Sequence, residues 1–138
     1  MSFLLDTVVL SELRKARPSR KVVQWIKAQK PESLFISVVS IGEIERGIER
    51  VRKSDAKFAA ELEHWLETLL SLYADRVLPV SANAAQLWGR LSAKLGHDGA
   101  DLLIAATALS HGATVVTRNV KHFAPTGVRV FDPFGDVK

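Results

Sequence analysis

Short apolar segments alternate along this chain with longer segments of helical periodicity. Five of the short segments are rich in β-branched or aromatic residues, lie between turn-forming residues and have the length of buried strands. We expect strands at residues 3–5, 34–38, 77–80, 114–117 and 128–131.

The segments between these strands have the pattern of amphipathic helices. In residues 55–73, apolar side chains recur at intervals of three and four. Residues 100–110 are apolar nearly all round, so we expect this helix to be buried. Strands separated by helical crossovers predict an α/β fold with a central, mostly parallel sheet of about five strands and helices on both faces.

Polar residues at the helix starts predict how several helices are capped. Ser19 and Ser81 precede two amphipathic segments and are expected N-caps. Asp98 is the expected cap of the buried helix. Ser40 lies three residues before Glu43, which is the spacing of a capping box.

Composition limits the classes of protein to consider. A chain of 138 residues, 47% of them hydrophobic, fits a single domain over residues 1–138, with the last few residues expected to be a frayed tail. The absence of cysteine excludes disulfides, thiolate zinc sites and cysteine nucleophiles. Asp6 interrupts the apolar N-terminal run, and no basic residue precedes it, so we expect neither a signal peptide nor a membrane span and predict a cytoplasmic protein.

Three acidic residues occupy positions where a parallel sheet collects ligands. Asp6 follows the first predicted strand, Glu43 lies in the helix after the second, and Asp101 begins the buried helix that leads to the next parallel strand. Carboxylates meeting there would repel one another unless a cation lay between them. All-oxygen ligation favours Mg²⁺ or Mn²⁺ over zinc, and such a site suits phosphodiester hydrolysis.

Each of these residues also has a purely structural interpretation. Asp6 is a candidate helix cap, and Glu43 a capping-box or surface-pair residue. Asp98 and Asp101 share one helical face, so one can cap while the other serves the site. Asn119, after the fourth strand, is either a turn residue or an oxygen ligand without charge.

Basic residues follow the acidic ones along the chain. The formal net charge is +4 and the pI about 9.6, which favours an anionic partner such as nucleic acid. A cationic rim around the acidic residues would bind RNA phosphates, although solvated helix faces are an equally open interpretation. The candidates for this rim are Arg14, Lys15 and Arg118, with a further cluster that includes Arg46 and Arg50. The histidines show no ligand spacing, and His122 alone remains a candidate general base.

Several segments together resemble the PIN-domain ribonucleases and, within them, the VapC toxins of bacterial type II toxin–antitoxin systems. These segments are LLDTVVLSELRK, ISVVSIGEIERGIER, LPVSANAAQLWGRL, DLLIAATA and TVVTRNVKHF, in the order and spacing of the family. The resemblance implies a ribonuclease that uses magnesium or manganese. It makes Asp6, Glu43 and Asp101 the catalytic residues, with Asp6 and Asp101 as the principal metal ligands and Glu43 completing the cluster or activating water.

The same resemblance implies partners. It predicts a small VapB-like antitoxin that covers the acidic pocket, a homodimer, contact with operator DNA only through the antitoxin, and an RNA substrate, with tRNA as a candidate. Two positions depart from the family: Val8 stands where relatives commonly carry Asn, and Asn119 where they carry a fourth acid.

These departures keep a second interpretation open. It is a catalytically weak binding module that joins its antitoxin on operator DNA as a co-repressor. A receiver domain fits poorly, because VLPVSANAAQ and TVVTRNV lack the carboxylate and lysine that such a domain needs.

Overall fold

The computed structural model describes residues 1–135 and contains one five-stranded sheet. Its strands pair in parallel in the order β3-β2-β1-β4-β5. They are β1 (Phe3–Leu5), β2 (Leu34–Ser37), β3 (Val77–Leu78), β4 (Thr114–Val116) and β5 (Val130–Phe131). This confirms the predicted α/β fold.

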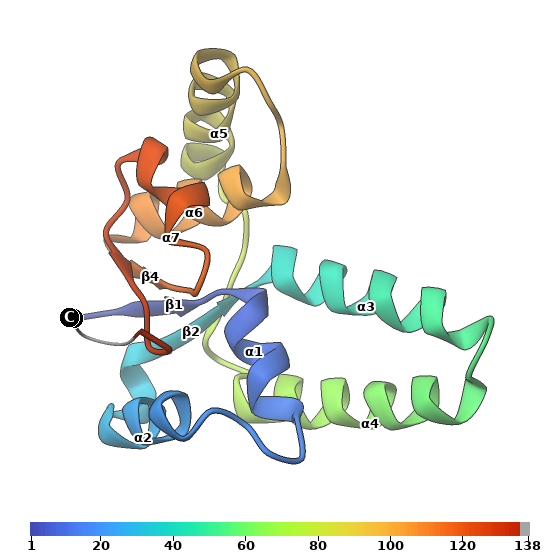
Figure 1. The fold of residues 1–138 in the computed structure, drawn as a ribbon. Coiled ribbons are helices and arrows are strands. Elements are labelled where there is room, and N and C mark those ends of the chain that lie inside the picture. The colour runs from blue at the N-terminus through green and yellow to red at the C-terminus, as the bar shows by residue number, and fades with distance from the viewer. Residues whose placement is uncertain (136–138) are drawn as a thin grey trace.

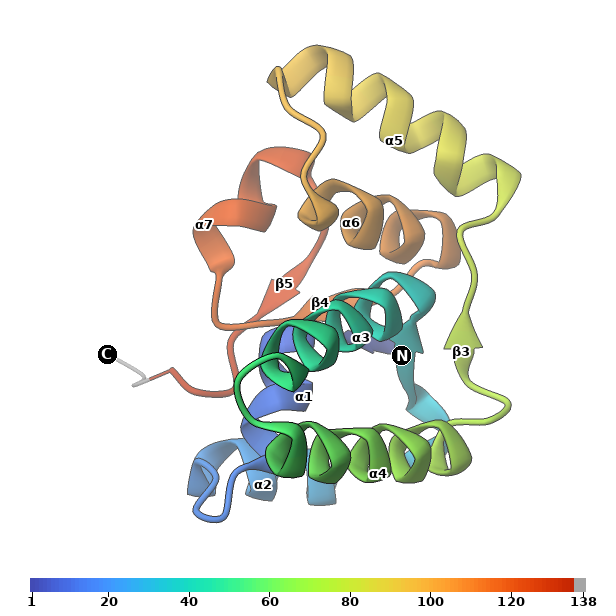
Figure 2. The same ribbon diagram turned by 90° about the vertical axis from the view of Figure 1, so that its right-hand side faces the viewer.

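Helices connect the strands and cover the sheet (Figures 1 and 2). Two short 3₁₀ turns, at Pro31–Ser33 and Ala124–Thr126, complete the described elements. The helices are α1 (Thr7–Arg14), α2 (Arg20–Ala28), α3 (Val38–Arg52), α4 (Ala56–Leu72), α5 (Ala82–Leu95), α6 (Ala100–His111) and α7 (Val120–Phe123).

Alternating side chains of the strands divide the core between the two faces of the sheet. Leu5 and Val116 pack with buried residues of α1 to α4, whereas Leu4 and Val115 pack with α6 and α7. Helices therefore cover both faces, as predicted. The middle of α6 is buried, at Leu102 and residues 104–108, as expected from its apolar composition.

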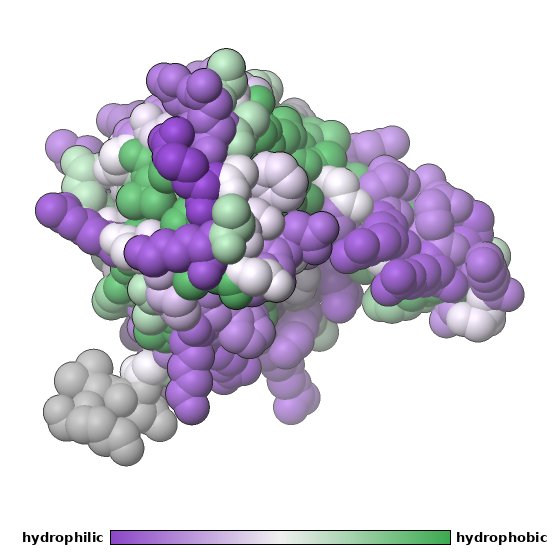
Figure 3. Space-filling model, turned by 90° about the horizontal axis from the view of Figure 1, so that it is seen from above, coloured by the Kyte–Doolittle hydropathy of each residue, from purple (hydrophilic) through white to green (hydrophobic). Residues whose placement is uncertain are grey.

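The antiparallel pair α3 and α4 projects away from the sheet (Figure 1). Ile48 of α3 and Leu66 of α4 are buried and belong to one apolar cluster. The far end of the pair, at the right of Figure 3, carries mainly hydrophilic side chains. The base of α3 is therefore fixed by packing, and its solvent-facing positions can serve a site beside the sheet.

Two of the predicted caps are correct and two are wrong. The hydroxyls of Ser19 and Ser81 accept hydrogen bonds from the first turns of α2 and α5. Ser37, not Ser40, caps α3, because strand β2 ends one residue earlier than predicted and the Ser40 hydroxyl is used elsewhere. The cap position of α6 is Gly99, not Asp98, and it makes no side-chain cap bond.

Two further predictions from the sequence concern membrane-spanning helices and the C-terminal tail. No helix within residues 1–135 is both long enough and apolar enough to cross a membrane. The frayed tail was predicted for residues 135–138, and all but the first of these lie outside the described residues.

Candidate active site

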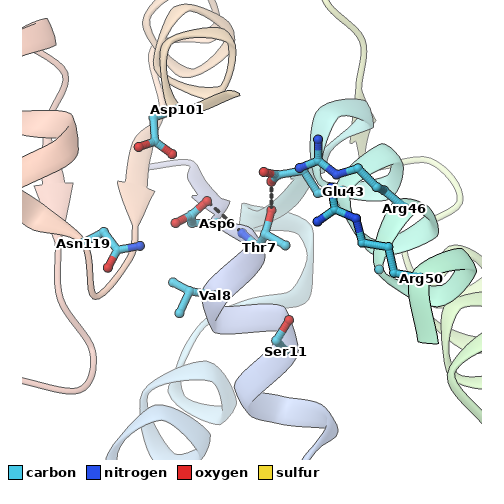
Figure 4. A pocket seen from close by; sticks show the side chains of 10 residues that line it. Asp6, Thr7, Val8, Ser11, Glu43, Arg46, Arg50, Asp101 and Asn119 are labelled. Carbon is cyan, nitrogen blue, oxygen red and sulfur yellow. Dashed lines mark hydrogen bonds between the residues drawn. The ribbon is translucent and has the colours of Figure 1, made fainter. Parts of the chain in front are cut away.

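A pocket of about 410 Å³ opens at the carboxyl ends of β1 and β4 (Figure 4). Chain segments that are far apart in the sequence meet here, because neighbouring parallel strands end at the same edge of the sheet. Its lining is Asp6, Thr7, Val8, Ser11, Glu43, Arg46, Gly47, Arg50, Asp101 and Asn119. The structure thus brings the three acidic residues singled out from the sequence to one pocket.

Asp6 is the most buried of these acids, with 4% of its surface exposed. It is the N-cap of α1: Oδ1 accepts a hydrogen bond from the backbone N–H of Thr7 at 2.8 Å. Oδ2 accepts a second bond from the hydroxyl of Thr117 at 2.7 Å. The capping and site interpretations of Asp6 are therefore compatible, because the cap fixes the carboxylate at the pocket.

The pKa of Asp6 is raised from 3.8 to about 6. Burial is the largest cause, and the negative charges of Asp101 and Glu43 add to it. The hydrogen bonds from Thr117 and Thr7 act in the opposite direction without cancelling the effect. A carboxylate held in this way is stabilised by a cation placed against it.

Glu43 reaches the pocket from α3 and is half-buried. The Thr7 hydroxyl donates a hydrogen bond to Glu43 Oε1 at 2.6 Å and lies 2.7 Å from the hydroxyl oxygen of Ser40. Ser40 thus takes part in a contact between α1 and α3 instead of capping its own helix. The capping box predicted from its spacing to Glu43 is wrong for this reason.

Asp101 lies in the first turn of α6, across the pocket from Glu43 (Figure 4). Its side chain is about one-third exposed, and Oδ2 lies 3.2 Å from Nδ1 of His122. Asp98 is exposed and does not line the pocket. Of the two acids at this helix start, the structure places only Asp101 at the candidate site.

Asn119 and Val8 complete the wall on the side of β4 and α1. The backbone N–H of Asn119 donates to the hydroxyl of Thr117 at 2.9 Å. Its φ is −89°, so the left-handed turn conformation considered for this residue is not present. The Asn119 side chain makes no capping bond to α7, so its amide lines the pocket beside the carboxylates (Figure 4).

The donor set of the pocket fits a hard divalent cation. Carboxylate oxygens and one amide oxygen are the ligands that Mg²⁺ and Mn²⁺ prefer, and Mg²⁺ commonly keeps several waters between itself and the protein. Within residues 1–135 no group of three acidic or histidine side chains lies close enough together to hold a metal ion. The fit to a divalent cation therefore rests on the chemistry of the donors that line the pocket.

The three basic residues predicted to bind RNA do not line this pocket. The Arg14 guanidinium lies 5.4 Å from the ring centroid of Phe58, and Arg118 lies 4.1 Å from that of Phe134. Lys15 forms a 2.9 Å ion pair with Glu12.

Two other arginines, Arg46 and Arg50, extend from α3 along the Glu43 side of the pocket (Figure 4). They belong to a basic cluster visible in the sequence, and their spacing of four residues places them on one helical face. This spacing is the feature of the sequence that could have identified them as residues lining the pocket.

Comparison with known proteins gives one consistent result. Residues 3–126 match the PIN domain. The chain is 36% identical over 138 residues to "VapC ribonuclease Y4jK" of Sinorhizobium fredii, covering 95% of this chain and 96% of that protein. It is 31% identical to "Toxin FitB" of Neisseria gonorrhoeae, covering 96% and 99% of the two chains. The crystal structure of FitAcB from Neisseria gonorrhoeae superimposes with a TM-score of 0.84 at 32% identity, covering 96% of this chain and 98% of that one.

Proposed function

Because the chain belongs to the PIN-domain family, we propose that it is a metal-dependent endoribonuclease that acts as the toxin of a toxin–antitoxin pair. One observation carries the proposal: Asp6, Glu43 and Asp101, from three separate elements, line one pocket. Relatives named as a VapC ribonuclease and as a toxin support the same activity. RNA in the cytoplasm, with tRNA as one candidate, is the proposed substrate.

Asp6 and Asp101 are the proposed ligands of Mg²⁺ or Mn²⁺. When bound, such an ion supplies a Lewis acid that activates water and neutralises charge on the phosphodiester. Thr117 and the backbone of Thr7 hold both oxygens of Asp6 in place through hydrogen bonds. His122 holds one oxygen of Asp101, so each ligand carboxylate is oriented before the ion arrives.

Glu43 is the proposed acceptor of the proton from the attacking water. Its Oε1 is held by the Thr7 hydroxyl, which leaves Oε2 for the water. Hydrolysis adds this water to phosphorus and breaks the bond to the leaving ribose oxygen. Arg46 and Arg50 line the same side of the pocket, where their guanidinium groups bind the phosphate oxygens.

An apolar groove continues from the acidic pocket between α3 and α4. The two share Thr7, Ser11, Glu43 and Gly47, so a segment lying in the groove reaches the acids directly. The apolar part of the groove is lined by Ile44, Ile48, Val51, Phe58, Leu62 and Trp65. An amphipathic segment of a VapB-like antitoxin fits this lining.

Similar solved structures support the assembly proposed for this chain. One is described as FitAB bound to an IR36 DNA fragment, at 30% identity and a TM-score of 0.84. For this chain we propose assembly with its antitoxin on operator DNA, contact with that DNA only through the antitoxin, and a homodimer.

The activity is tested with protein purified free of its antitoxin, single-stranded and structured RNAs, and Mn²⁺ or Mg²⁺. We expect cleavage that EDTA stops and that Asp6→Asn or Asp101→Asn reduces by at least about 100-fold, as expected for loss of metal affinity and transition-state charge stabilisation. Asp98→Asn is the matched control, since it removes the same charge from the same helix start outside the pocket. RNA that stays intact with folded wild-type protein would instead favour the co-repressor module.

A further inference from the structure

A second hollow adjoins the acidic pocket on the other side of Asp101. It has a volume of about 340 Å³ and is lined by His97, Asp101, Lys121, His122 and Pro125. We call it the α7 hollow, after the helix that contributes Lys121 and His122. Because Asp101 lines both spaces, a ligand chain that passes Asp101 from the acidic pocket enters the α7 hollow.

The α7 hollow offers mainly hydrogen-bond donors. The ammonium of Lys121 has three donors and no acceptor. His97 Nδ1 accepts a hydrogen bond from the backbone N–H of Gly99 at 3.3 Å, so in the neutral ring the proton is on Nε2, which is then a donor. Donors from two chain segments at one hollow favour an anionic ligand.

A metal ion is a poor alternative for the same space. Lys121 brings a positive charge to the hollow, which disfavours a cation there. Asp101 is the single carboxylate among the lining residues, and it is paired with His122 at 3.2 Å.

Basic residues flank the acidic pocket on both sides. Arg46 and Arg50 line it on the side of α3, opposite Asp101 (Figure 4). Lys121 lines the α7 hollow beyond Asp101. A single RNA strand carries a phosphate at every nucleotide, so a strand with one phosphate at the acidic pocket presents the next one to either flank.

Resting on the ribonuclease function proposed above, we propose that the α7 hollow is a subsite for the RNA phosphate next to the cleaved linkage. Lys121 and His97 donate to its oxygens. Asp101, which lines both spaces and lies 3.2 Å from His122, separates this phosphate from the reacting one. The subsite fixes the path and orientation of the strand at the acidic pocket, without reading the bases.

The test is a cycle that combines protein variants with a modified RNA. Fluorescent single-stranded RNAs of one sequence each carry one uncharged methylphosphonate, at successive positions, and binding is measured by anisotropy in EDTA so that no cleavage occurs. We expect Lys121→Ala to weaken binding of unmodified RNA about tenfold, the loss of one charge-assisted hydrogen bond. Methylphosphonate at one position should weaken RNA binding by wild type by a similar factor. It should cause no further loss of affinity in Lys121→Ala.

His97→Ala should show the same coupling at the same position. Lys121→Arg keeps the positive charge and should retain most of the wild-type affinity. Lys94→Ala is the matched control, because it removes an exposed lysine of α5 that lines neither hollow. Circular dichroism of each variant verifies the fold.

The subsite would be overturned if the losses of affinity caused by the substitution and by the methylphosphonate simply add. It would also be overturned if both alanine variants bind RNA as wild type does. Wild-type cleavage in Mn²⁺ is scored separately. Coupled losses of affinity without cleavage would support the phosphate site and refute the ribonuclease activity. Cleavage without coupled losses would support the ribonuclease activity and refute the phosphate site.

Discussion

Thr117 donates a hydrogen bond from its hydroxyl to Oδ2 of Asp6 at 2.7 Å, across 111 residues of sequence. The bond joins the residue after β4 to the residue after β1, and both residues are buried. The same hydroxyl oxygen accepts from the backbone N–H of Asn119 at 2.9 Å. One threonine therefore orients a proposed metal ligand and positions the loop that carries Asn119.

Thr117→Val removes this hydroxyl and keeps the shape of the side chain. We expect the free energy of unfolding to fall by about 1–3 kcal/mol, since Asp6 and the Asn119 N–H each lose a buried partner. Affinity for Mn²⁺ should fall about tenfold, within the range measured when such outer partners are removed. Urea unfolding and Mn²⁺ titration measure the two effects.

Thr107→Val is the control, because its buried hydroxyl donates only to the carbonyl of Leu103 within α6. It should leave Mn²⁺ affinity unchanged. Equal losses of Mn²⁺ affinity in both variants would contradict the role assigned to Thr117.

The raised pKa of Asp6 predicts how stability depends on pH when no metal is present. A carboxyl whose folded-state pKa is about 6, against 3.8 when unperturbed, binds its proton more tightly in the folded chain. Its contribution to stability is complete below pH 3.8 and is lost as pH rises through 6. The loss is about 3 kcal/mol on the conversion of 1.36 kcal/mol per pKa unit.

The measurement compares wild type with Asp6→Asn in EDTA between pH 4 and pH 7.5. The variant should gain relative stability across this range, since Asn has no charge to bury. Taking the difference between the two proteins removes the opposite contribution of Glu12, whose pKa is lowered by its bonds to Lys15 and the Ser19 N–H. Parallel pH profiles would show that Asp6 is not perturbed.

Glu12 itself predicts a variant that affects folding but not the site. Its Oε2 accepts a 2.7 Å hydrogen bond from the backbone N–H of Ser19, and Oε1 pairs with Lys15. Glu12→Gln should lower the free energy of unfolding at pH 7 by about 1–2 kcal/mol, because a charge-assisted bond is weakened. Activity at a temperature where the variant stays folded should equal that of wild type. A loss of activity in the folded variant would show that the α1–α2 loop contributes to catalysis.

Arg46 and Arg50 should contribute more to RNA binding than the basic residues first chosen from the sequence. An arginine that contacts a phosphate displaces counterions from the RNA. Arg46→Ala should therefore reduce the slope of log affinity against log salt concentration by about 0.7 for a single strand. Lys15→Ala should change it little, since Lys15 is paired with Glu12. Affinities at several salt concentrations measure both slopes. A larger change for Lys15→Ala would contradict the assignment.

The sequence predicted the sheet, and the meeting of three acidic residues at one pocket, because both follow from local pattern. Short apolar runs identify the strands, and a carboxylate directly after a strand is visible in one line of sequence. The helix caps and the basic contacts depend on tertiary packing. Ser40 is taken from capping by its contact with Thr7, and the face that α3 turns toward the pocket is set by its packing on α4. Neither contact has a local signal, and the bond between Thr117 and Asp6 has none either.

In the proposed function, a divalent cation compensates the acids that line one pocket. Thermal unfolding at increasing Mn²⁺ concentration detects such an ion, since an ion that binds only the folded state raises the melting temperature with concentration. We expect the melting temperature to rise for wild type and for Asp98→Asn, and to rise much less for Asp6→Asn and Asp101→Asn. If the wild-type melting temperature does not change with Mn²⁺ concentration, or if it rises equally in all four proteins, then Asp6 and Asp101 do not bind the cation.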